Sequence, residues 1–391
     1  MIPYVEIIDK TTLKVTALVE PQECWFELSY FDVGECELYC VALSTNLANL
    51  LKGNYLKIPN KPYIWVITSL TYTYVEGVPM IDAKGYEAKW LLNKRVIRAP
   101  IELPNQVALA VEQLVYNNLG AGAAAVRQIA GFNVYTSGIK TTNSYVEETT
   151  LYNLDAATVN LSTLNQKPKT TSIKDTTVVF GAATQAPRGN LLEFVNNILK
   201  TYNLGSIVTY ENEQLVYKVI QGQDLSASVR FSQSLDNLIE SNYYTDDSKI
   251  GTNALVVSTV DDVDYWQVYD EGATGVDRAE ILINSNISTE YTPQGATDPV
   301  KLDLTNPTDL ALYYSWLQQE GRTGLAEYIE NNEVSSTLDL VNSNYEFSND
   351  YFIGDIVGVI DEYFNYNASA RIIKFTFKQD SGGYGEEADY Q

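Results

Sequence analysis

The chain has 391 residues, of which 45% are hydrophobic, and this fits a folded protein of about two to four domains rather than a disordered one. Its 50 acidic and 26 basic residues give a formal net charge of −24, so we expect no affinity for a phosphate backbone. The sequence contains no histidine, which excludes Ser-His-Asp and Cys-His catalysis and removes the commonest metal ligand.

The N-terminal segment and the cysteines bear on the cellular compartment. The opening MIPYVEIIDK has no basic stretch followed by an apolar one, and no apolar run reaches the roughly 18 residues of a transmembrane helix. We therefore expect no signal peptide and no membrane insertion. Cys36 and Cys40 have a spacing that metal ligands can show, but Cys24 leaves an odd count without a second pair. We favour reduced, partly buried thiols in a protein made in a cytosol.

Residues 1–103 are predicted to form a first β unit. Apolar and polar residues alternate over 25–30 and 35–41, which is typical of half-buried strands. Pro100 and Pro104 mark the end of this unit, because proline interrupts regular structure.

Residues 104–190 are predicted to be a helix followed by an irregular insertion. The helix covers 106–119, has apolar residues at helical spacing and ends before Gly120. Residues 191–226 are predicted to form a small α/β unit, in which a helix over 191–202 precedes a β-hairpin.

Residues 227–385 are predicted to form a second β unit. It contains a helix over 308–331, which we expect to be kinked between Gly321 and Gly324. The last residues, 386–391, follow a Gly-rich acidic stretch and are expected to be a flexible tail.

A short turn-and-strand pattern occurs twice, once in each β unit. Gly53-Asn54 precedes alternating apolar residues and a strand that begins at Ile67, and Gly354-Asp355 precedes the same pattern with a strand that begins at Ile372. Both strands have the form Ile-x-x-[Leu/Phe]-Thr-[Tyr/Phe]. The repeat favours an α+β, mainly β fold with two similar β-barrel domains and helical and small α/β insertions. Chance is the alternative, since Gly-polar turns between strands are common in β proteins.

The residues of this pattern are predicted to be structural. Gly53, Asn54, Gly354 and Asp355 would form the turns, because glycine tolerates unusual backbone conformations. The residues predicted for the barrel core or a subunit contact are Trp25, Trp65, Ile67, Leu70, Ile356, Ile372 and Phe375. Trp25, Trp65 and Trp90 could also offer flat faces to a sugar, a use that we favour less than packing.

Acidic clusters are the remaining candidates for chemistry. Asp261-Asp262-Val263-Asp264 and Asp270-Glu271 could bind a divalent cation, but their spacing does not match a Ca²⁺ loop, and a solvated loop is the simpler interpretation. Glu147-Glu148 and Glu386-Glu387 are sequence neighbours, whereas glycoside cleavage needs two carboxylates across a cleft. We therefore predict no catalytic residue, no metal site and no cofactor.

Segments spread over nearly the whole chain carry a resemblance to a known family. They are residues 25–34, 51–53, 64–70, 84–86, 91–95, 191–222, 230–232, 236–238, 246–257, 349–357 and 370–372. In this order they are similar to the hub proteins at the tip of long phage tails. These are the tail-associated or baseplate hub proteins of siphophages, which are related in fold to the trimeric hub of contractile tails. Residues 120–190 match no part of this family.

The resemblance implies a homotrimer in which two tube-like barrels per chain form a ring with pseudo-sixfold symmetry. Such a ring would adapt a sixfold tail tube to a threefold tip. The implied partners are further copies of the chain, a distal tail protein or tail tube, a tape-measure protein, and tip or receptor-binding proteins. DNA would pass through an acidic lumen without specific binding. The implied location is the virion tail tip or baseplate, after synthesis in the host bacterial cytoplasm.

Two alternatives come from other functional classes. A carbohydrate-binding module would use the many Tyr and Trp faces, and it predicts a monomer with measurable sugar affinity. A carboxylate-dependent cell-wall hydrolase, which we rank last, predicts activity that is lost when one or two acidic residues are changed.

Overall fold

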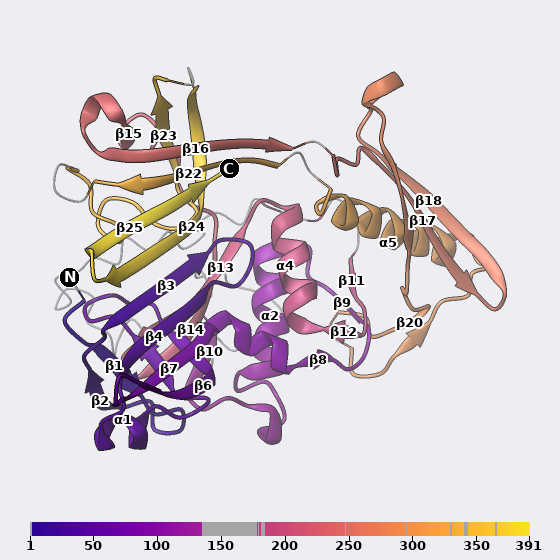
Figure 1. Ribbon diagram of the computed structural model, residues 1–391. Coiled ribbons are helices and arrows are strands. Elements are labelled where there is room, and N and C mark those ends of the chain that lie inside the picture. Colours follow the sequence, from indigo (N-terminus) through magenta and orange to yellow (C-terminus); the bar gives the residue numbers. More distant parts are fainter. Residues whose placement is uncertain are drawn as a thin grey trace, which may run out of the picture.

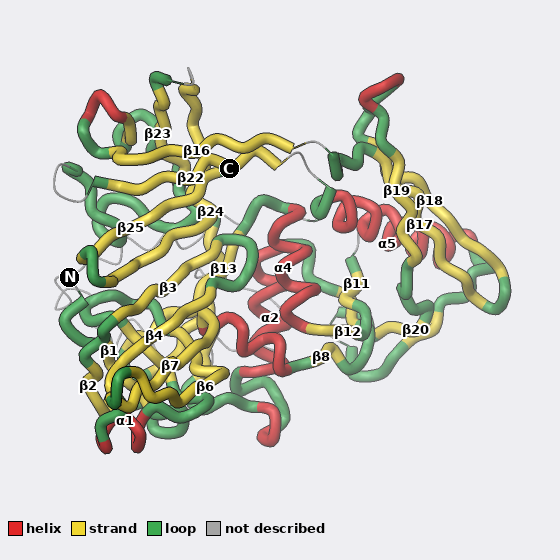
Figure 2. The backbone as a smooth tube through the Cα atoms, viewed as in Figure 1, coloured by secondary structure: helices red, strands yellow, loops and turns green. Residues whose placement is uncertain are grey.

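A large β-sheet, a central layer with two helices and a smaller lobe follow one another across the molecule (Figures 1 and 2). The computed structural model describes residues 2–134, 178, 180, 184–246, 248–294, 296–328, 331–339, 343–363 and 366–391. Most of the predicted irregular insertion, with Glu147-Glu148, lies outside the described residues.

The first β unit forms the part of the large sheet that contains the N-terminus. Its elements are β1 (Val5–Ile8), β2 (Val15–Val19), β3 (Glu23–Ser29), β4 (Glu35–Val41), α1 (Ser44–Asn49), β5 (Tyr55–Lys57), β6 (Trp65–Val75) and β7 (Val78–Glu87). Buried residues alternate with more exposed ones along β4, so that Cys36 and Cys40 both face the core. All three cysteines are buried and free, and burial raises the pKa of the Cys40 thiol to about 11.

The second β unit continues the same sheet. Its elements are β15 (Arg230–Ser232), η3 (Gln233–Leu235), β16 (Leu238–Asp246), β22 (Asn331–Leu338), β23 (Ile356–Asp361), β24 (Tyr366–Asp380) and β25 (Gly383–Tyr390). The chain end corrects the expectation of a flexible tail over 386–391. β25 pairs with both β22 and β24, and Tyr390 is fully buried, because every second residue of this strand faces the core.

The two β units share one 13-stranded sheet. Its main path is β16-β22-β25-β24-β3-β4-β7-β6-β5-β1-β2. Outside this path, β23 pairs with β24, and β15 pairs with β23. The pairing of β24 with β3 joins the units, so each unit covers an edge strand of the other. The mainly β class is confirmed, but the described strands contain no closed barrel, which corrects the prediction of two barrel domains.

A helical layer lies between the large sheet and the lobe (Figure 2). Its helices and turns are η1 (Ala88–Lys94), α2 (Val107–Leu119), η2 (Ala125–Arg127) and α4 (Leu191–Thr201), and its strands are β8 (Val96–Ile97), β9 (Ile101–Glu102), β10 (Phe132–Val134), β11 (Gln185–Ala186), β12 (Gly189–Asn190), β13 (Gly205–Glu211) and β14 (Gln214–Ile220). The two helices and the hairpin β13–β14 confirm the elements predicted over 106–119 and 191–226. Asn190 caps α4 by accepting a hydrogen bond from the backbone N–H of Glu193.

The lobe consists of a three-stranded sheet with one helix on its inner face. Its elements are β17 (Asn253–Val260), β18 (Val263–Asp270), η4 (Gly275–Asp277), β19 (Glu280–Asn284), β20 (Glu290–Tyr291), β21 (Val300–Lys301) and α5 (Pro307–Leu325). The helix predicted over 308–331 is thus shorter, and it runs through both glycines. A Cβ atom on Gly321 would lie 2.8 Å from Tyr269, and one on Gly324 would lie 2.3 Å from Ile283. The glycines therefore let the helix approach the sheet.

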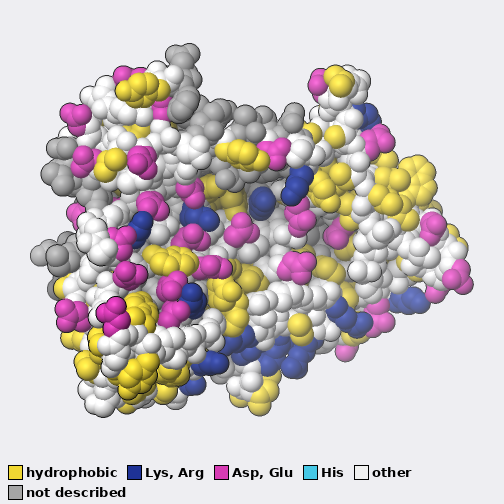
Figure 3. Space-filling model, in the orientation of Figure 1, with side chains coloured by type: hydrophobic (Ala, Val, Ile, Leu, Met, Phe, Trp, Pro, Cys, Tyr) yellow, Lys and Arg dark blue, Asp and Glu magenta, His cyan; other side chains and the backbone are white. Residues whose placement is uncertain are grey.

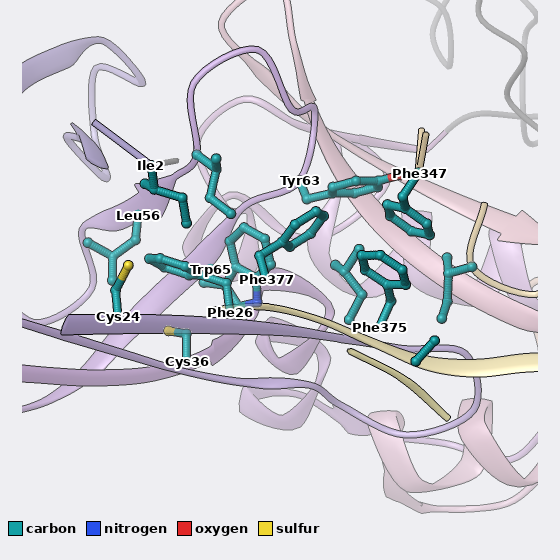
Figure 4. Packing of buried hydrophobic residues seen from close by; sticks show 14 of the residues in the cluster. Ile2, Cys24, Phe26, Cys36, Leu56, Tyr63, Trp65, Phe347, Phe375 and Phe377 are labelled. Carbon is teal, nitrogen blue, oxygen red and sulfur yellow. The ribbon is translucent and has the colours of Figure 1, made fainter. Parts of the chain in front are cut away.

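Aromatic residues from both β units form one core. Figure 4 shows Phe26 and Trp65 of the first unit beside Phe375 and Phe377 of the second. The rings of Phe347 and Phe375 are stacked with their centroids 3.6 Å apart. The common core makes the two units mutually dependent for burial of apolar surface. None of the helices in the described residues is long and apolar enough to cross a membrane.

Candidate functional site

The two copies of the repeated pattern make the same backbone hydrogen bonds. The N–H of Gly53 donates to the carbonyl of Ile67 at 2.8 Å, and the N–H of Ile67 donates to the carbonyl of Asn54 at 2.9 Å. In the second copy, Gly354 and Ile372 form the equivalent bond at 2.8 Å, and Ile372 donates to Asp355 at 2.9 Å. We call each of these arrangements a clamp. The shared bonds are strong evidence against chance resemblance of the two segments.

Each clamp has the same backbone conformation and the same irregularity after it. Gly53 has a φ of 91° and Gly354 a φ of 90°, a region that side chains with a Cβ rarely adopt. The pairing register shifts between Ile67 and Ser69 in β6, and between Ile372 and Lys374 in β24. Such a β-bulge bends a strand, so both copies bend at the residue that follows the clamp isoleucine.

The polar residue of each clamp forms a side-chain hydrogen bond with an earlier part of the chain. The side-chain oxygen of Asn54 accepts from the N–H of Lys10 at 3.2 Å. Asp355 accepts from the N–H of Gln223 at 2.7 Å and from that of Phe352 at 2.9 Å. Burial of this carboxyl raises its pKa to about 6, although the two N–H groups and Arg371 act in the opposite direction.

The other predicted structural residues lie in or beside the common core. Trp65, Ile67, Ile372 and Phe375 are fully buried, whereas Trp25, Leu70 and Ile356 are half-buried. The Trp65 indole donates to the carbonyl of Glu27 at 2.7 Å, which satisfies its buried N–H.

The tryptophans predicted as possible sugar platforms are engaged within the chain. The Trp25 indole donates to Glu37 at 3.2 Å, and Trp90 stacks on Tyr86 with ring centroids 5.6 Å apart. Trp65 is fully buried. Trp266 on the lobe, which the sequence did not single out, is 59% exposed.

Tyr30 joins the β sheet to the central layer, although no sequence pattern distinguishes it from the other tyrosines among the 29 in the chain. Its hydroxyl lies 3.1 Å from the carbonyl oxygen of Asn203 and 2.9 Å from that of Gln221. Its ring packs against Gly354, where an added Cβ would lie 2.3 Å away, and the guanidinium of Arg371 lies 5.2 Å from the ring centroid. The second clamp is therefore built around this ring.

A buried ion pair connects the first unit to the central layer and was also missed by the sequence analysis. Glu87 and Lys89 lie 3.5 Å apart with side chains that are 1% and 0% exposed. Glu87 accepts from the N–H groups of Ser29 and Gly34, and Lys89 donates to the carbonyl of Ser206 at 3.0 Å. Burial raises the pKa of Glu87 and lowers the pKa of Lys89, and each partner opposes the shift of the other.

A basic cleft borders each clamp. The cleft at the first clamp has a volume of about 410 Å³, and the basic residues in its wall are Lys10, Lys52, Lys94 and Arg95. The cleft at the second clamp has a volume of about 590 Å³ and lies between the second β unit, α4 and the lobe. The charged residues in its wall are Lys200, Arg322 and Arg371, with one side-chain carboxylate, that of Glu271. Both clefts suit acidic groups, by charge, better than neutral ones.

The acidic clusters occupy separate positions. Asp261 and Asp262 form the tight turn between β17 and β18, with φ of 50° and 63°. Asp270 pairs with Arg278 at 2.9 Å. Glu386 is buried and accepts from the Tyr384 hydroxyl at 2.6 Å, so it faces away from its neighbour Glu387 across the strand. Within the described residues, no group of three or more Cys, Asp or Glu side chains is placed to hold a metal ion.

Comparison with known proteins gives one family and a fold. The family model described as Siphovirus ReqiPepy6 Gp37-like protein matches residues 4–388. The structure is similar to the tail protein from Neisseria meningitidis MC58, with a TM-score of 0.54 and 11% identity over 99% of this chain and 95% of that one. It is also similar to the 43 kDa tail protein of prophage MuSo2 from Shewanella oneidensis, with a TM-score of 0.51 and 12% identity over 99% of this chain and 97% of that one.

At these identities the structural likeness is one of fold. A search of curated proteins finds no relative of this chain. The family and the fold together confirm the resemblance to siphophage tail proteins that the sequence indicated.

Proposed function

This chain belongs to the Siphovirus ReqiPepy6 Gp37-like protein family, and on that premise we propose that it is the structural hub of a phage tail tip or baseplate. The hub is a homotrimer without catalytic activity or cofactor. It joins the sixfold tail tube or distal tail ring to threefold tip and receptor-binding components, and it forms the channel through which the genome leaves.

The duplicated clamp is the observation that carries this proposal. Two copies of one strand arrangement, each with the same hydrogen bonds and the same bulge, give a single chain two similar surfaces. Three chains then present six such surfaces around a ring, which matches a sixfold tube on one side and a threefold tip on the other. The sheet that links the copies would hold them at a fixed spacing.

The net charge of −24 supports the channel part of the proposal. A lumen lined by carboxylates repels the DNA backbone, so DNA passes without specific binding. The tape-measure protein would occupy the same channel before ejection. In the assembled virion, the distal tail protein or tail tube is the partner on one face, and the tip or receptor-binding proteins are the partners on the other.

Sedimentation and negative-stain electron microscopy of the purified protein test the trimer. We expect particles of about three times the 43.7 kDa chain mass, with threefold symmetry and a central hole. The same measurement is made after addition of the phage's own distal tail protein, because a hub protein can be monomeric when free and trimerise only when it contacts its partner. Particles of single-chain mass in both samples would contradict the proposal that the chain is a trimeric hub. Glycan binding by those particles would assign the chain to the carbohydrate-binding alternative.

A further inference from the structure

Seven basic residues gather on one face of this acidic chain. They are Lys10, Lys52, Lys94, Arg95, Arg98, Arg127 and Arg188, and we call them the basic face. Figure 3 shows Lys and Arg side chains gathered along the lower edge of the molecule, below the helical layer. Within the part of the chain that the structure describes, none of the seven forms an ion pair with a carboxylate, whereas Lys57, Lys84 and Arg278 elsewhere do.

Neutral groups hold the basic face together. Arg95 donates to the carbonyl of Arg127 at 3.0 and 2.6 Å, and Arg127 donates to the carbonyl of Val96 at 2.8 Å. Arg188 donates to the carbonyl of Arg98 at 3.1 Å. These bonds fix the positions of the guanidinium groups but leave their charges uncompensated. Burial and then the charges of Arg98 and Arg95 lower the pKa of Arg127, as expected where like charges are held together.

The lobe presents an apolar face that is exposed and that no other described element of the chain packs against. Leu255 of β17 lies opposite Val268 of β18 and Leu282 of β19. Trp266 lies opposite Val257, two residues further along β17 and therefore on the same face. Trp266 is 59% exposed and Leu282 is 63% exposed. Figure 3 shows hydrophobic side chains gathered over the lobe. The opposite face of the sheet, which carries Ala254 and Val256, packs on α5. A continuous exposed apolar patch of this kind marks an interaction surface.

An acidic hairpin tip borders this apolar face. Asp261, Asp262 and Asp264 lie at the turn between β17 and β18 and are exposed, and we call them the acidic tip. Asp264 accepts a hydrogen bond from Thr259 at 2.6 Å, and none of the three is ion-paired among the described residues. The lobe therefore combines an apolar centre with an uncompensated negative edge, as protein interfaces commonly do.

We propose that the lobe of one copy of this chain docks on the basic face of a second copy, with the acidic tip among the seven cations. The exposed apolar residues Val96 and Val126, which are 53% and 92% exposed, lie on the basic face and meet the apolar face of the lobe. The two surfaces differ, so the contact is head-to-tail and can close into a ring. Charge complementarity identifies a second copy of this chain as the partner, because each copy carries both the negative acidic tip and the positive basic face. This docking rests on the proposed trimer and specifies its contact.

Charge reversal on each surface tests the docking. The variant Asp261→Lys/Asp262→Lys reverses the charge of the acidic tip. Lys52→Glu/Arg98→Glu reverses part of the basic face at residues that contribute only their backbone carbonyls to hydrogen bonds within the described residues. Sedimentation velocity should show that each double variant associates about 100-fold more weakly than the unmodified chain, since like charges then meet. The quadruple variant, in which both surfaces are reversed, should recover the trimer. Glu20→Lys/Glu76→Lys changes the net charge by the same amount and in the same direction as the tip variant, on other exposed residues, and should leave assembly unchanged.

The outcomes separate the docking from the trimer. If the unmodified chain forms trimers and both double variants do so equally well, the docking is wrong and the trimer stands. If the unmodified chain is monomeric with and without its distal tail partner, the trimer and the docking both fail. If trimers are unaffected by reversal of the tip, but a fluorescent DNA duplex binds only to chains with an intact basic face, the docking is wrong and that face binds nucleic acid.

Discussion

Phe377 of β24 lies directly opposite Phe26 of β3, and both side chains are fully buried. The pair sits where the two β units meet, with the ring of Phe375 5.2 Å from that of Phe377. Because this contact belongs to both units, neither unit has a complete core without the other. We therefore expect the large sheet to unfold as one cooperative body.

Replacement of Phe377 tests this cooperativity. We expect Phe377→Ala to lower the free energy of unfolding by about 3–5 kcal/mol, the usual cost of emptying a buried aromatic site. Hydrogen exchange should then show faster opening in β3 of the first unit as well as in β25 of the second. Tyr74→Ala removes an aromatic side chain that is 78% exposed in the same sheet, and it should change stability by less than about 0.5 kcal/mol. Faster exchange in β25 with unchanged β3 would show two independent units.

The approach of Gly222 to Gly354 gives a second prediction. Gly222 has a φ of 76°, and an added Cβ would lie 1.8 Å from the carbonyl oxygen of Gly354. Gly77 has a φ of 85° with nothing within 4 Å of an added Cβ. We expect Gly77→Ala to cost about 1–2 kcal/mol from backbone conformation alone, and Gly222→Ala to cost about 1–3 kcal/mol more from overpacking. Denaturant unfolding measures both, and equal costs would show that the second clamp can relax.

The buried pair Glu87–Lys89 gives a third prediction. Lys89→Met should destabilise the fold by about 3–5 kcal/mol, because it leaves the Glu87 carboxylate buried without its partner. Glu87→Gln/Lys89→Met removes both charges and should recover a large part of that loss. A double-mutant cycle of unfolding free energies measures the coupling between the two residues. Additive costs for the two single changes would show that the charges do not stabilise each other.

The elements that could be predicted from the sequence are those with local signals. The helix α4 has an amphipathic pattern and a capping Asn190, and the clamps were found from Gly53 and Gly354 with their following isoleucines. These features depend on residues close together in the chain. Backbone conformation and apolar spacing are enough to specify them.

The pairing of β24 with β3 could not be predicted in this way, because it joins segments from the two ends of the chain. The same holds for the hydrogen bonds of Tyr30 to Gln221 and of Lys89 to Ser206, whose acceptors lie far away in sequence. The strand β25 is a different case. Glu386, Ala388 and Tyr390 are buried at every second position, so a period-two signal was present. Its acidic and glycine-rich composition hid that signal, and only the partner strands β22 and β24 make it a strand.

The two clamps differ in one titratable group, which gives a pH prediction. Asp355 is 1% exposed, and burial raises its pKa from 3.8 to about 6, whereas the first clamp has the neutral Asn54 at this position. A carboxyl whose pKa is raised by folding stabilises the fold when protonated. This stabilisation is fully present below about pH 4, where the carboxyl is protonated in both the folded and the unfolded chain. It is lost as the pH rises through about 6, because ionisation costs more free energy in the folded chain than in the unfolded chain. The shift corresponds to about 3 kcal/mol.

We expect Asp355→Asn to remove this part of the pH dependence, so that the difference in unfolding free energy between the variant and the unmodified chain changes by about 3 kcal/mol between pH 4 and 7. The amide keeps an oxygen that can accept from Gln223 but places N–H groups near the N–H of Phe352, so the variant is less stable at pH 4. Its disadvantage should then shrink as the pH rises. Urea unfolding at a series of pH values measures the difference, with the exposed Asp298→Asn as the matched control. A difference that stays constant over this range would show that the Asp355 carboxyl ionises in the fold as easily as in the unfolded chain.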